Sequence, residues 1–364
     1  MSIGVRVLHH LELESRLDRS GISTAVDHQR RALRDRGVEV VTDPLGDAGL
    51  DTVVAGVDDL VTTGHGDPLV DYDLLHVSTV GPVSLALTGH ARRHGRPVVA
   101  NAHTTREDFA GSFRGSRLVG PLLETYLRRY YSRADLVVCP SEYTKGVLED
   151  YPVRAPVRPV TNGIDRDSMT GHEALRQRYR DRYDLSGTVV FCVGNVFERK
   201  GVAEFCEVAR RTDHEFAWFG HYDTGPRAST TVRRLTSDPP ENVTFTGWVE
   251  DKRGAFAAGD VLLLPAEVEN QGLVVLEAMA CEKPVVLSDI PVFREFFDDG
   301  EDCLRGASVP EYVDAVDRLV ADPELRERLG AAGRETAAEH SLDRVGERLA
   351  AAYRELLDGS PGAE

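Results

Sequence analysis

The chain has 364 residues, 41% of them hydrophobic and 28% charged, and its formal net charge at pH 7 is −17. Its length is about twice that of one ordinary domain, so two domains of similar size are expected. The excess of acid excludes a typical nucleic-acid-binding protein, and no apolar run approaches the roughly 18–20 residues that a membrane-spanning helix needs.

Predicted strands and helices alternate along the first half of the chain. Residues 5–10 (VRVLHH) are typical of a strand, and a loop with Ser20 and Gly21 leads to a helix that ends at Gly37. Further strands are predicted at residues 38–41, 74–77, 97–103 and 136–141. Prolines cluster and periodicity stops in residues 152–165, where we expect the linker between the domains.

The second half repeats this alternation. Strands are predicted at residues 188–195, 215–220, 242–247, 261–266 and 284–288, and charged helices follow from 309 to 357. Strands that alternate with helices indicate βαβ units and parallel sheets. The expected fold is therefore α/β, with two doubly wound, Rossmann-like domains at 1–160 and 161–340 that face a central cleft. A terminal helix at 341–364 is expected to cross back to the first domain.

Charge is distributed unevenly along the chain. Only four of the 43 basic residues are lysines, and abundant acid with scarce lysine predicts a halophilic, high-salt proteome. Residues 1–166 hold 20 basic and 22 acidic groups, a net −2, whereas residues 167–364 hold 23 and 38, a net −15. The first half is thus expected to approach an anionic partner.

Cysteine usage and the N-terminal segment both favour a cytoplasmic protein. The five cysteines are scattered and form no CxxC pair, so we expect reduced core residues and no structural zinc. The N-terminal stretch MSIGVRVLHHLELES carries acids where a signal peptide is apolar, so no export signal is expected.

Two carboxylates stand at the mouth of a predicted helix, in the stretch AEVENQGLVVLEAMACEKPVV (266–286). Glu269 lies in the loop after a predicted strand, and Glu277 lies eight positions later, in the helix that begins near Gly272. The amides of residues 271–273 and the helix dipole form a site for a diphosphate or for sugar hydroxyls. The alternative is that one acid is an ordinary loop residue and the other a solvated helix residue.

A basic turn follows the strand predicted at 188–195. In GNVFERKG (194–201), Arg199 and Lys200 stand where the next helix opens. Two cations at a strand-to-helix turn can neutralise the charge of a leaving diphosphate, although a solvated basic turn is the alternative. Lys200 is one of only four lysines, and because the turn lies in the same predicted domain as Glu269, we favour the functional interpretation.

Together these motifs resemble the retaining GT-B glycosyltransferases of family four. The resemblance extends over nearly the whole chain, and the E-x7-E motif is its most specific element. The other matching segments are SGIST (20–24), NAHTT (101–105), ADLVVCPSEYTK (134–145), TNGID (161–165), GNVFERKG (194–201), FAWFG (216–220), NVTFTGWVED (242–251) and PVVLSDIPVFRE (284–295). The finer pattern is similar to the diacylglycerol glucosyltransferases, which form glycolipids.

The resemblance implies a role for each matching residue. The implied catalytic residues are Glu269, Lys200, Arg199 and His103. Glu269 and His103 would contact the donor sugar, and the two cations would bind the diphosphate. The implied donor-binding residues are Gly21, Asn195, Asn270, Gln271, Gly272, Leu273 and Glu277, the last of which would hold the ribose hydroxyls. A structural hydrogen bonder remains the alternative for His103.

Two positions depart from the family pattern. Asn195 stands where many members carry arginine, so Arg199 is expected to supply the second positive charge. Asn270-Gln271 replaces a common Gly-Phe, which leaves the donor preference open between UDP-hexose and GDP-mannose.

Neither a further cofactor nor a metal is implied by the resemblance. The triplets Asp71-Tyr72-Asp73 and Asp165-Arg166-Asp167 resemble the metal-binding DxD motif of GT-A enzymes. Because one abuts a strand start and the other the predicted linker, we do not expect either to hold a metal.

Residues 106–133 combine apolar side chains with six arginines and three acids, a net +3. This composition is typical of a basic amphipathic helix that contacts an anionic membrane and a lipid acceptor. The candidate contact residues are Phe109, Phe113, Arg114, Arg117, Arg128 and Arg129. The open alternative is a domain helix whose apolar face packs on the sheet.

The expected function is retaining, metal-independent transfer of a hexose from a nucleotide sugar to a lipid or lipid-linked acceptor. The expected location is the cytoplasmic face of the membrane, with peripheral attachment. A soluble or polyprenyl-linked glycan is the alternative acceptor. A nucleotide-sugar epimerase would replace the E-x7-E frame with its own acids, and a non-catalytic sugar-binding protein would be expected to lose Glu269 or Lys200.

Overall fold

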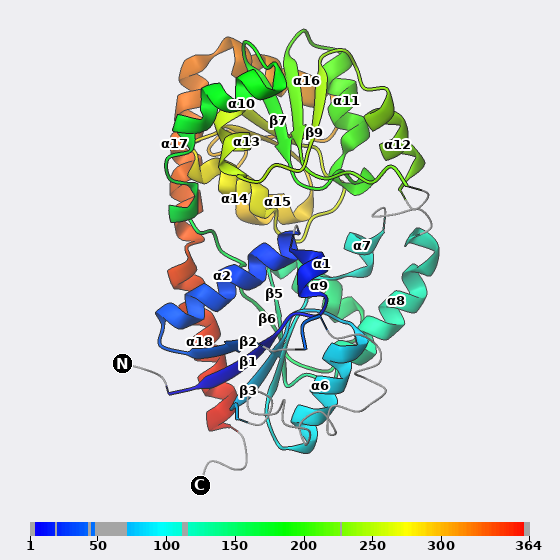
Figure 1. The fold of residues 1–364 in the computed structure, drawn as a ribbon, viewed down its shortest axis with the longest axis vertical. Helices are drawn as coiled ribbons and strands as arrows, with labels where there is room; N and C mark the ends of the chain where they lie inside the picture. Colours follow the sequence, from blue (N-terminus) through cyan, green and yellow to red (C-terminus); the bar gives the residue numbers. More distant parts are fainter. Residues whose placement is uncertain are drawn as a thin grey trace. The chain divides into compact units, whose positions relative to one another are not determined.

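The structure is a computed structural model that describes residues 4–18, 20–42, 45–47, 71–110, 116–225 and 228–359 (Figure 1). The chain forms two compact units. The first contains Met1–Arg106, Pro121–Gly163 and Leu342–Glu364, and the second contains Glu107–Gly120 and Ile164–Ser341. Of the residues that the structure describes, 107–110 and 116–120 belong to the second unit, although the sequence-based boundary had placed them in the first domain.

A six-stranded parallel sheet forms the centre of the first unit. Its strands are β1 (Arg6–His10), β2 (Glu39–Thr42), β3 (Leu74–Val77), β4 (Val98–Asn101), β5 (Leu136–Cys139) and β6 (Val157–Pro159). They lie in the order β2-β1-β3-β4-β5-β6, and each neighbouring pair is parallel. β6 lies within residues 152–165 and was not predicted as a strand, because a three-residue edge strand is too short to show a period of two.

Helices flank both faces of this sheet. They are α1 (Glu14–Leu17), α2 (Gly21–Asp35), α6 (Pro82–Arg93), α9 (Glu142–Asp150) and α18 (Leu342–Asp358), with α7 (Arg106–Phe109) and α8 (Ser116–Tyr131) in the connection from β4 to β5. In Figure 1, α2 (blue) and α18 (red) lie side by side. Gly346 permits this approach, because a Cβ there would lie 2.3 Å from the carbonyl oxygen of Ala32.

Alternate residues of the strands build two separate apolar cores. Leu8 and Leu75 belong to the core that α6 and α9 cover, whereas Val7 and Leu74 belong to the core that α2 and α18 cover. Parallel strands buried on both faces carry continuous apolar runs, which is why these segments were recognisable in the sequence.

A second six-stranded parallel sheet forms the centre of the second unit. Its strands are β7 (Val189–Val193), β8 (Glu215–Phe219), β9 (Val243–Gly247), β10 (Val261–Leu264), β11 (Val285–Ser288) and β12 (Leu304–Gly306). They lie in the order β12-β11-β10-β7-β8-β9, and all neighbours are parallel. The chain thus starts at β7 in the middle and builds outward on both sides, so that the direction of winding reverses between β7 and β10.

The connections of the second unit are mostly short helices. They are η1 (Asp167–Met169), η2 (His172–Leu175), α10 (Arg176–Tyr183), η3 (Glu198–Lys200), α11 (Val202–Arg210), α12 (Thr230–Ser237), α13 (Arg253–Ala258), α14 (Leu273–Ala280), α15 (Pro291–Phe296), α16 (Val309–Ala321) and α17 (Pro323–Glu339). Among the described residues of the whole chain, none of the helices is both long and apolar enough to cross a membrane.

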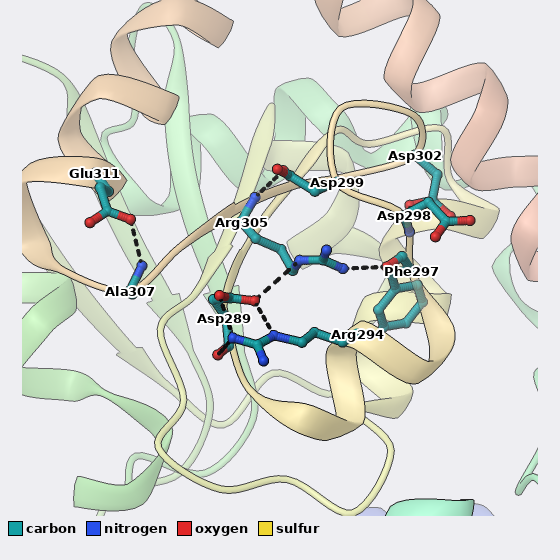
Figure 2. A network of polar contacts seen from close by, with 9 residues as sticks. All are labelled: Asp289, Arg294, Phe297, Asp298, Asp299, Asp302, Arg305, Ala307 and Glu311. Atoms are coloured by element: carbon teal, nitrogen blue, oxygen red, sulfur yellow. Dashed lines mark hydrogen bonds and ion pairs between the residues drawn. The ribbon is translucent and has the colours of Figure 1, made fainter.

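A network of charged side chains holds α15 against the end of β11 (Figure 2). Arg294 donates from Nε and Nη2 to the two carboxylate oxygens of Asp289, both at 2.6 Å. Arg305 donates from Nη1 to the carbonyl oxygen of Phe297 at 2.5 Å. The helix fixed in this way carries Phe293, whose ring packs beneath Gly272, because a Cβ at Gly272 would lie 2.8 Å from Phe293 Cε1. The network therefore supports the loop that precedes α14.

Candidate functional site

The loops after β7 and β10 meet at the point where the second sheet changes its direction of winding. β7 and β10 are neighbours, with Val190 opposite Val261 and Phe191 opposite Leu262. In open α/β sheets, ligands bind outside the carboxyl ends of the strands at such a switch point. The basic turn and the first glutamate of the E-x7-E motif both lie in these two loops.

A glycine allows the two loops to touch. Gly201 has a φ of +75°, and a Cβ there would lie 2.0 Å from the carbonyl oxygen of Pro265. The contact continues along the backbone, where the amide of Glu267 donates to the carbonyl oxygen of Arg199 at 2.8 Å. Any larger residue at position 201 would separate the basic turn from the loop of Glu269.

The contact between the loops brings Lys200, Arg199 and Glu269 together. Lys200 Nζ lies 2.8 Å from Glu269 Oε1, and Arg199 Nη1 lies 3.8 Å from the same oxygen. All three side chains are largely buried, with 10–15% of their surface exposed. Burial by itself would raise the pKa of Glu269, but Lys200 and Arg199 outweigh it and hold that pKa below its usual value. Glu269 is therefore ionised at neutral pH.

Asp108 is a fourth charged member of this cluster. Its Oδ1 lies 3.0 Å from Arg199 Nη1. In the sequence, Asp108 is one of the three acids of the amphipathic segment 106–133 and was not predicted as a site residue. No local signal in the sequence marks Asp108, because its contact with Arg199 depends on residues 107–110 belonging to the second unit. With two cations and two carboxylates, the cluster has no net formal charge.

The amino end of α14 opens beside this cluster. Its N-cap is Gly272, in the left-handed conformation with φ 85° and ψ 61°, and glycine has no side chain to cap the first amides. The corresponding helix of the first unit is different: Glu12 accepts hydrogen bonds from the amides of Val83 at 3.2 Å and Ser84 at 2.8 Å. The first sheet thus carries its own anion at its switch point, whereas no side chain caps the amino end of α14 in the part of the chain that the structure describes.

The second glutamate of the motif is not the solvated helix residue of the alternative interpretation. Glu277 is 6% exposed, and its Oε1 lies 2.6 Å from Nζ of Lys252, just before α13. Gln271 and Gly272 are also buried, while the remaining predicted donor-binding residues of this unit are half-buried: Asn195, Asn270 and Leu273. A buried carboxylate paired with a partly exposed lysine is suited to accept hydrogen bonds from hydroxyl groups.

Comparison with known proteins decides the family. Residues 187–322 match the family described as Glycosyl transferases group 1, and residues 60–168 match Glycosyltransferase Family 4. The processive diacylglycerol alpha-glucosyltransferase of Acholeplasma laidlawii is 31% identical over 97% of this chain and 99% of its own length. The chain belongs to glycosyltransferase family four. The predicted family and enzyme class, the retaining GT-B hexosyltransferases, are thereby confirmed.

A further sequence relative and a solved structure are also similar to this family-four chain. The GDP-mannose-dependent alpha-(1-6)-phosphatidylinositol monomannoside mannosyltransferase of Mycolicibacterium smegmatis is 32% identical, over 79% of this chain and 78% of the relative. The crystal structure of Anabaena HepE in complex with UDP and glucose has a TM-score of 0.75 at 18% identity, covering 96% of this chain and all of HepE. The GT-B prediction is confirmed. Family four uses nucleotide sugars as donors.

Two predicted site residues of the family-four chain lie in the first unit. His103 follows β4 and is 7% exposed, and burial lowers its pKa to about 4, so its ring is neutral at pH 7. Gly21 is the first residue of α2, and a Cβ there would meet no atom within 4 Å. The packing of the protein itself does not require a glycine at this position.

The acidic triplets serve local structure. Arg6 pairs with Asp71 and donates its amide to Asp73 at 2.7 Å, and Asp165 accepts from the amide of Ser168 at 3.3 Å. In the part of the chain that the structure describes, no group of three or more His, Cys, Asp or Glu residues is arranged to hold a metal. The five cysteines are free and buried.

The predicted amphipathic segment 106–133 is not one helix. It contains the four-residue α7 and the longer α8. One side of α8 is buried and another is exposed to solvent. Leu127, Tyr130 and Tyr131 are buried in the core of the first unit, as the packing alternative expected. Arg128 and Arg129 are exposed, and Phe109 is half-buried. Of the other candidates, Arg117 belongs to α8, while Phe113 and Arg114 lie outside the described residues.

An apolar strip remains exposed on α8. Val119, Leu122 and Tyr126 are 42%, 76% and 36% exposed, and their spacing places them on one side of the helix. Among the described residues, only Leu13 and Trp248 are other large hydrophobic side chains with comparable exposure. We call Val119, Leu122 and Tyr126 the α8 strip.

Proposed function

We propose that the protein transfers a hexose from UDP-hexose or GDP-mannose, with retention and without a metal, to a lipid or lipid-linked hydroxyl at the cytoplasmic face of a membrane. The observation that carries the transfer reaction is the buried contact of Lys200 and Arg199 with Glu269, beside the amino end of α14. A catalytically dead relative would have no reason to keep buried cations at this position.

The donor is proposed to bind along this edge of the sheet. Lys200, Arg199 and the first amides of α14 bind the diphosphate, since cations and helix amino ends both favour anions. Glu277 holds the ribose hydroxyls and Glu269 the hydroxyls of the donor sugar. On the matching family positions, His103 is proposed to contact the sugar and Gly21 the phosphates.

Charge explains how such a site promotes transfer. Breaking the bond between sugar and diphosphate builds positive charge on the anomeric carbon and negative charge on the leaving oxygen. Preorganised cations and helix amides stabilise the leaving group, because they need no reorganisation as the charge develops. The ionised Glu269 stabilises the positive charge that develops on the anomeric carbon. The acceptor hydroxyl attacks the anomeric carbon from the face that the diphosphate leaves, and its proton passes to the leaving phosphate oxygen, so that the configuration is retained.

The first prediction concerns Glu277. Glu277→Gln keeps the volume of the side chain but removes a charged acceptor, and hydrogen bonds to charged groups contribute about 1.5–3 kcal/mol. We expect UDP or GDP, whichever binds the wild type, to bind roughly 10–100-fold more weakly, as measured by calorimetry. Glu282→Gln is the control, because Glu282 is half-exposed and pairs with Arg334 on the surface. Equal affinities in Glu277→Gln and the wild type would contradict the assignment.

Two observations support a lipid acceptor. The names of two relatives specify lipids, diacylglycerol in one case and phosphatidylinositol monomannoside in the other. In this chain the exposed Arg129 lies three positions after Tyr126, on the same side of α8 as the α8 strip, and the exposed Arg128 lies further round the helix. Apolar side chains next to arginines suit the interface of an anionic membrane, where each basic residue contributes about 1 kcal/mol of attraction.

The second prediction tests the α8 strip. Leu122→Ser is expected to weaken binding to vesicles of phosphatidylglycerol and phosphatidylcholine by about tenfold, since burying a leucine contributes about 1.5–3 kcal/mol. Vesicle flotation measures the bound fraction. Leu13→Ser, which changes an exposed leucine outside α8, is the control. If both variants float like the wild type, the strip is not a membrane contact.

The proposed function itself is tested by donor turnover. The protein is incubated with UDP-glucose, UDP-galactose or GDP-mannose in high salt, with and without a total lipid extract, and nucleotide release is measured. Release that depends on lipid, with a glycolipid product of retained configuration, is the expected result. Turnover with water-soluble acceptors alone would favour a soluble glycan acceptor instead.

A further inference from the structure

Charge balance around Arg199 poses a problem for a site that binds diphosphate. Two carboxylates already accompany the two cations, Glu269 at 2.8 Å from Lys200 and Asp108 at 3.0 Å from Arg199. Adding a diphosphate to a cluster with no net charge places unbalanced negative charge in a largely buried site, which is unfavourable. One of the resident carboxylates therefore opposes the ligand.

Of the two carboxylates, Asp108 is the one that a ligand can displace more easily. Glu269 follows β10 on a loop held from two sides, by the backbone bond between Glu267 and Arg199 and by Phe293 beneath Gly272. Asp108 lies instead on α7, a single turn of four residues. A short helical turn is rearranged at lower cost than a loop that is held by a backbone hydrogen bond and by side-chain packing.

The ionised form of Asp108 is also disfavoured where it stands. Burial raises the pKa of Asp108, and the attraction of Arg199 does not fully compensate. The Asp108–Arg199 ion pair therefore contributes little to the stability of the fold, because the cost of removing the two charges from water offsets most of their attraction. The contact is better explained by what Asp108 does to ligands of Arg199.

We propose that Asp108 competes with the diphosphate for Arg199, and that it thereby weakens the binding of the free nucleoside diphosphate more than the binding of the nucleotide sugar. The inference rests on the proposed function, since it assumes that the diphosphate binds at Arg199. On binding, a phosphate oxygen takes the place of Asp108 Oδ1 at the guanidinium, and α7 loses this contact with the basic turn at η3.

Asp108 affects the binding of product and substrate differently because the two molecules carry different charges. In a nucleotide sugar both phosphates are esterified and carry one charge each. A free nucleoside diphosphate has a terminal phosphate whose second pKa is about 6, so at neutral pH it carries about one further negative charge. A fixed carboxylate repels the more highly charged molecule more strongly. Asp108 thus favours release of the product over loss of the substrate.

The experiment compares ligand binding to the wild type and to Asp108→Asn, which keeps the shape of the side chain. Calorimetry is carried out with UDP, UDP-glucose and uridine, and in parallel with GDP, GDP-mannose and guanosine. We expect the diphosphate of the nucleotide that binds to gain about tenfold in affinity, its sugar ester only about threefold, and the nucleoside nothing. Product inhibition of turnover becomes correspondingly stronger.

Controls separate this competition from a structural effect. Glu107→Gln removes the same charge one residue earlier and is expected to leave all affinities unchanged. In an Arg199→Gln background, Asp108→Asn is expected to change diphosphate affinity by less than about twofold, because the two residues act as a pair. In the wild type, saturating diphosphate is expected to speed hydrogen exchange at residues 106–110, which tests the inference even if the variant folds poorly.

Other outcomes overturn the inference. Asp108→Asn variants that bind the diphosphate more weakly or equally well, or that change nucleoside affinity by the same factor, would show that Asp108 is not a competitor. Unchanged exchange at residues 106–110 would show that it is not displaced. A wild type that binds neither UDP nor GDP would remove the proposed function and this inference together, whereas normal binding with an inert Asp108 removes the inference alone.

Discussion

Replacement of Lys200 by alanine is expected to lower kcat by about 10²–10³-fold, with a smaller change in KM. Lys200 Nζ is buried beside Glu269 at the amino end of α14, where charge develops on the leaving diphosphate. A preorganised donor that acts mainly in the transition state contributes this magnitude to kcat. Initial rates with saturating nucleotide sugar and acceptor provide the measurement.

A matched control is available among the few lysines. Lys145 lies on α9 of the first unit and pairs with Glu142 at the surface, at 3.2 Å. Lys145→Ala should keep the wild-type kcat. Thermal unfolding of Lys200→Ala must also be followed, because losing its ion pair leaves Glu269 with Arg199 at 3.8 Å. A folded Lys200→Ala enzyme with near-normal kcat would remove Lys200 from the catalytic machinery.

The first unit contains buried histidines that predict acid-sensitive folding. The rings of His9 and His76 lie 4.4 Å apart between centroids, and His76 Nδ1 lies 2.6 Å from the hydroxyl of Tyr353 on α18. Burial, followed by the neighbouring His76 and Arg30, lowers the pKa of His9 well below its usual value. Burial also lowers the pKa of His76 to about 3 and that of His103 to about 4.

These lowered pKa values determine the sign of the pH effect. In the unfolded chain a histidine takes up its proton near pH 6.5, whereas the folded first unit takes it up only at much lower pH. Stability is therefore complete above about pH 6.5 and is lost as the pH falls towards the folded-state values. In that pH range, each of the three histidines lowers the free energy of unfolding by up to about 1.4 kcal/mol per pH unit as the pH falls.

We expect the free energy of unfolding of the first unit to fall steeply between pH 6.5 and 5. Urea titrations at several pH values, followed by far-UV circular dichroism, measure it; fluorescence is unsuitable because both tryptophans, Trp218 and Trp248, lie in the second unit. His76→Gln should reduce the slope by up to about 1.4 kcal/mol per pH unit.

His214 provides the control for this titration. It is partly exposed and pairs with Asp317 at the surface, so His214→Gln should leave the slope of the first unit unchanged. A slope in His76→Gln equal to that of the wild type would show that His76 is not held in its neutral form by burial.

Much of the fold was predictable because its signals are local. The continuous apolar runs of the longer strands, such as β1, β7 and β10, follow from burial of parallel strands on both faces. β6 and β12 escaped prediction, since three residues are too few to show a period. Residues 106–133 had the composition of an amphipathic helix, yet composition does not distinguish the side that packs inward at Leu127 from the side exposed at Leu122.

The residues of the candidate site also fall into those that could be predicted from the sequence and those that could not. Glu269, Lys200 and Arg199 were recognisable because each follows a predicted strand, and the ends of neighbouring parallel strands meet at one edge of a sheet. Lys252 and Asp108 were not recognisable as partners, since nothing near them in the sequence indicates Glu277 or Arg199. The Asp108–Arg199 pair joins residues 91 positions apart in the sequence, at 3.0 Å.

The amino-acid sequence alone therefore determined the α/β class, the family and the identity of the charged groups at the mouth of α14, because these depend on short motifs and on the periods of buried elements. Only the tertiary structure decided how those charges are balanced. The pairing of Asp108 with Arg199 and of Lys252 with Glu277 arises from packing between distant segments, where burial strengthens electrostatic interactions and raises the cost of any unpaired charge.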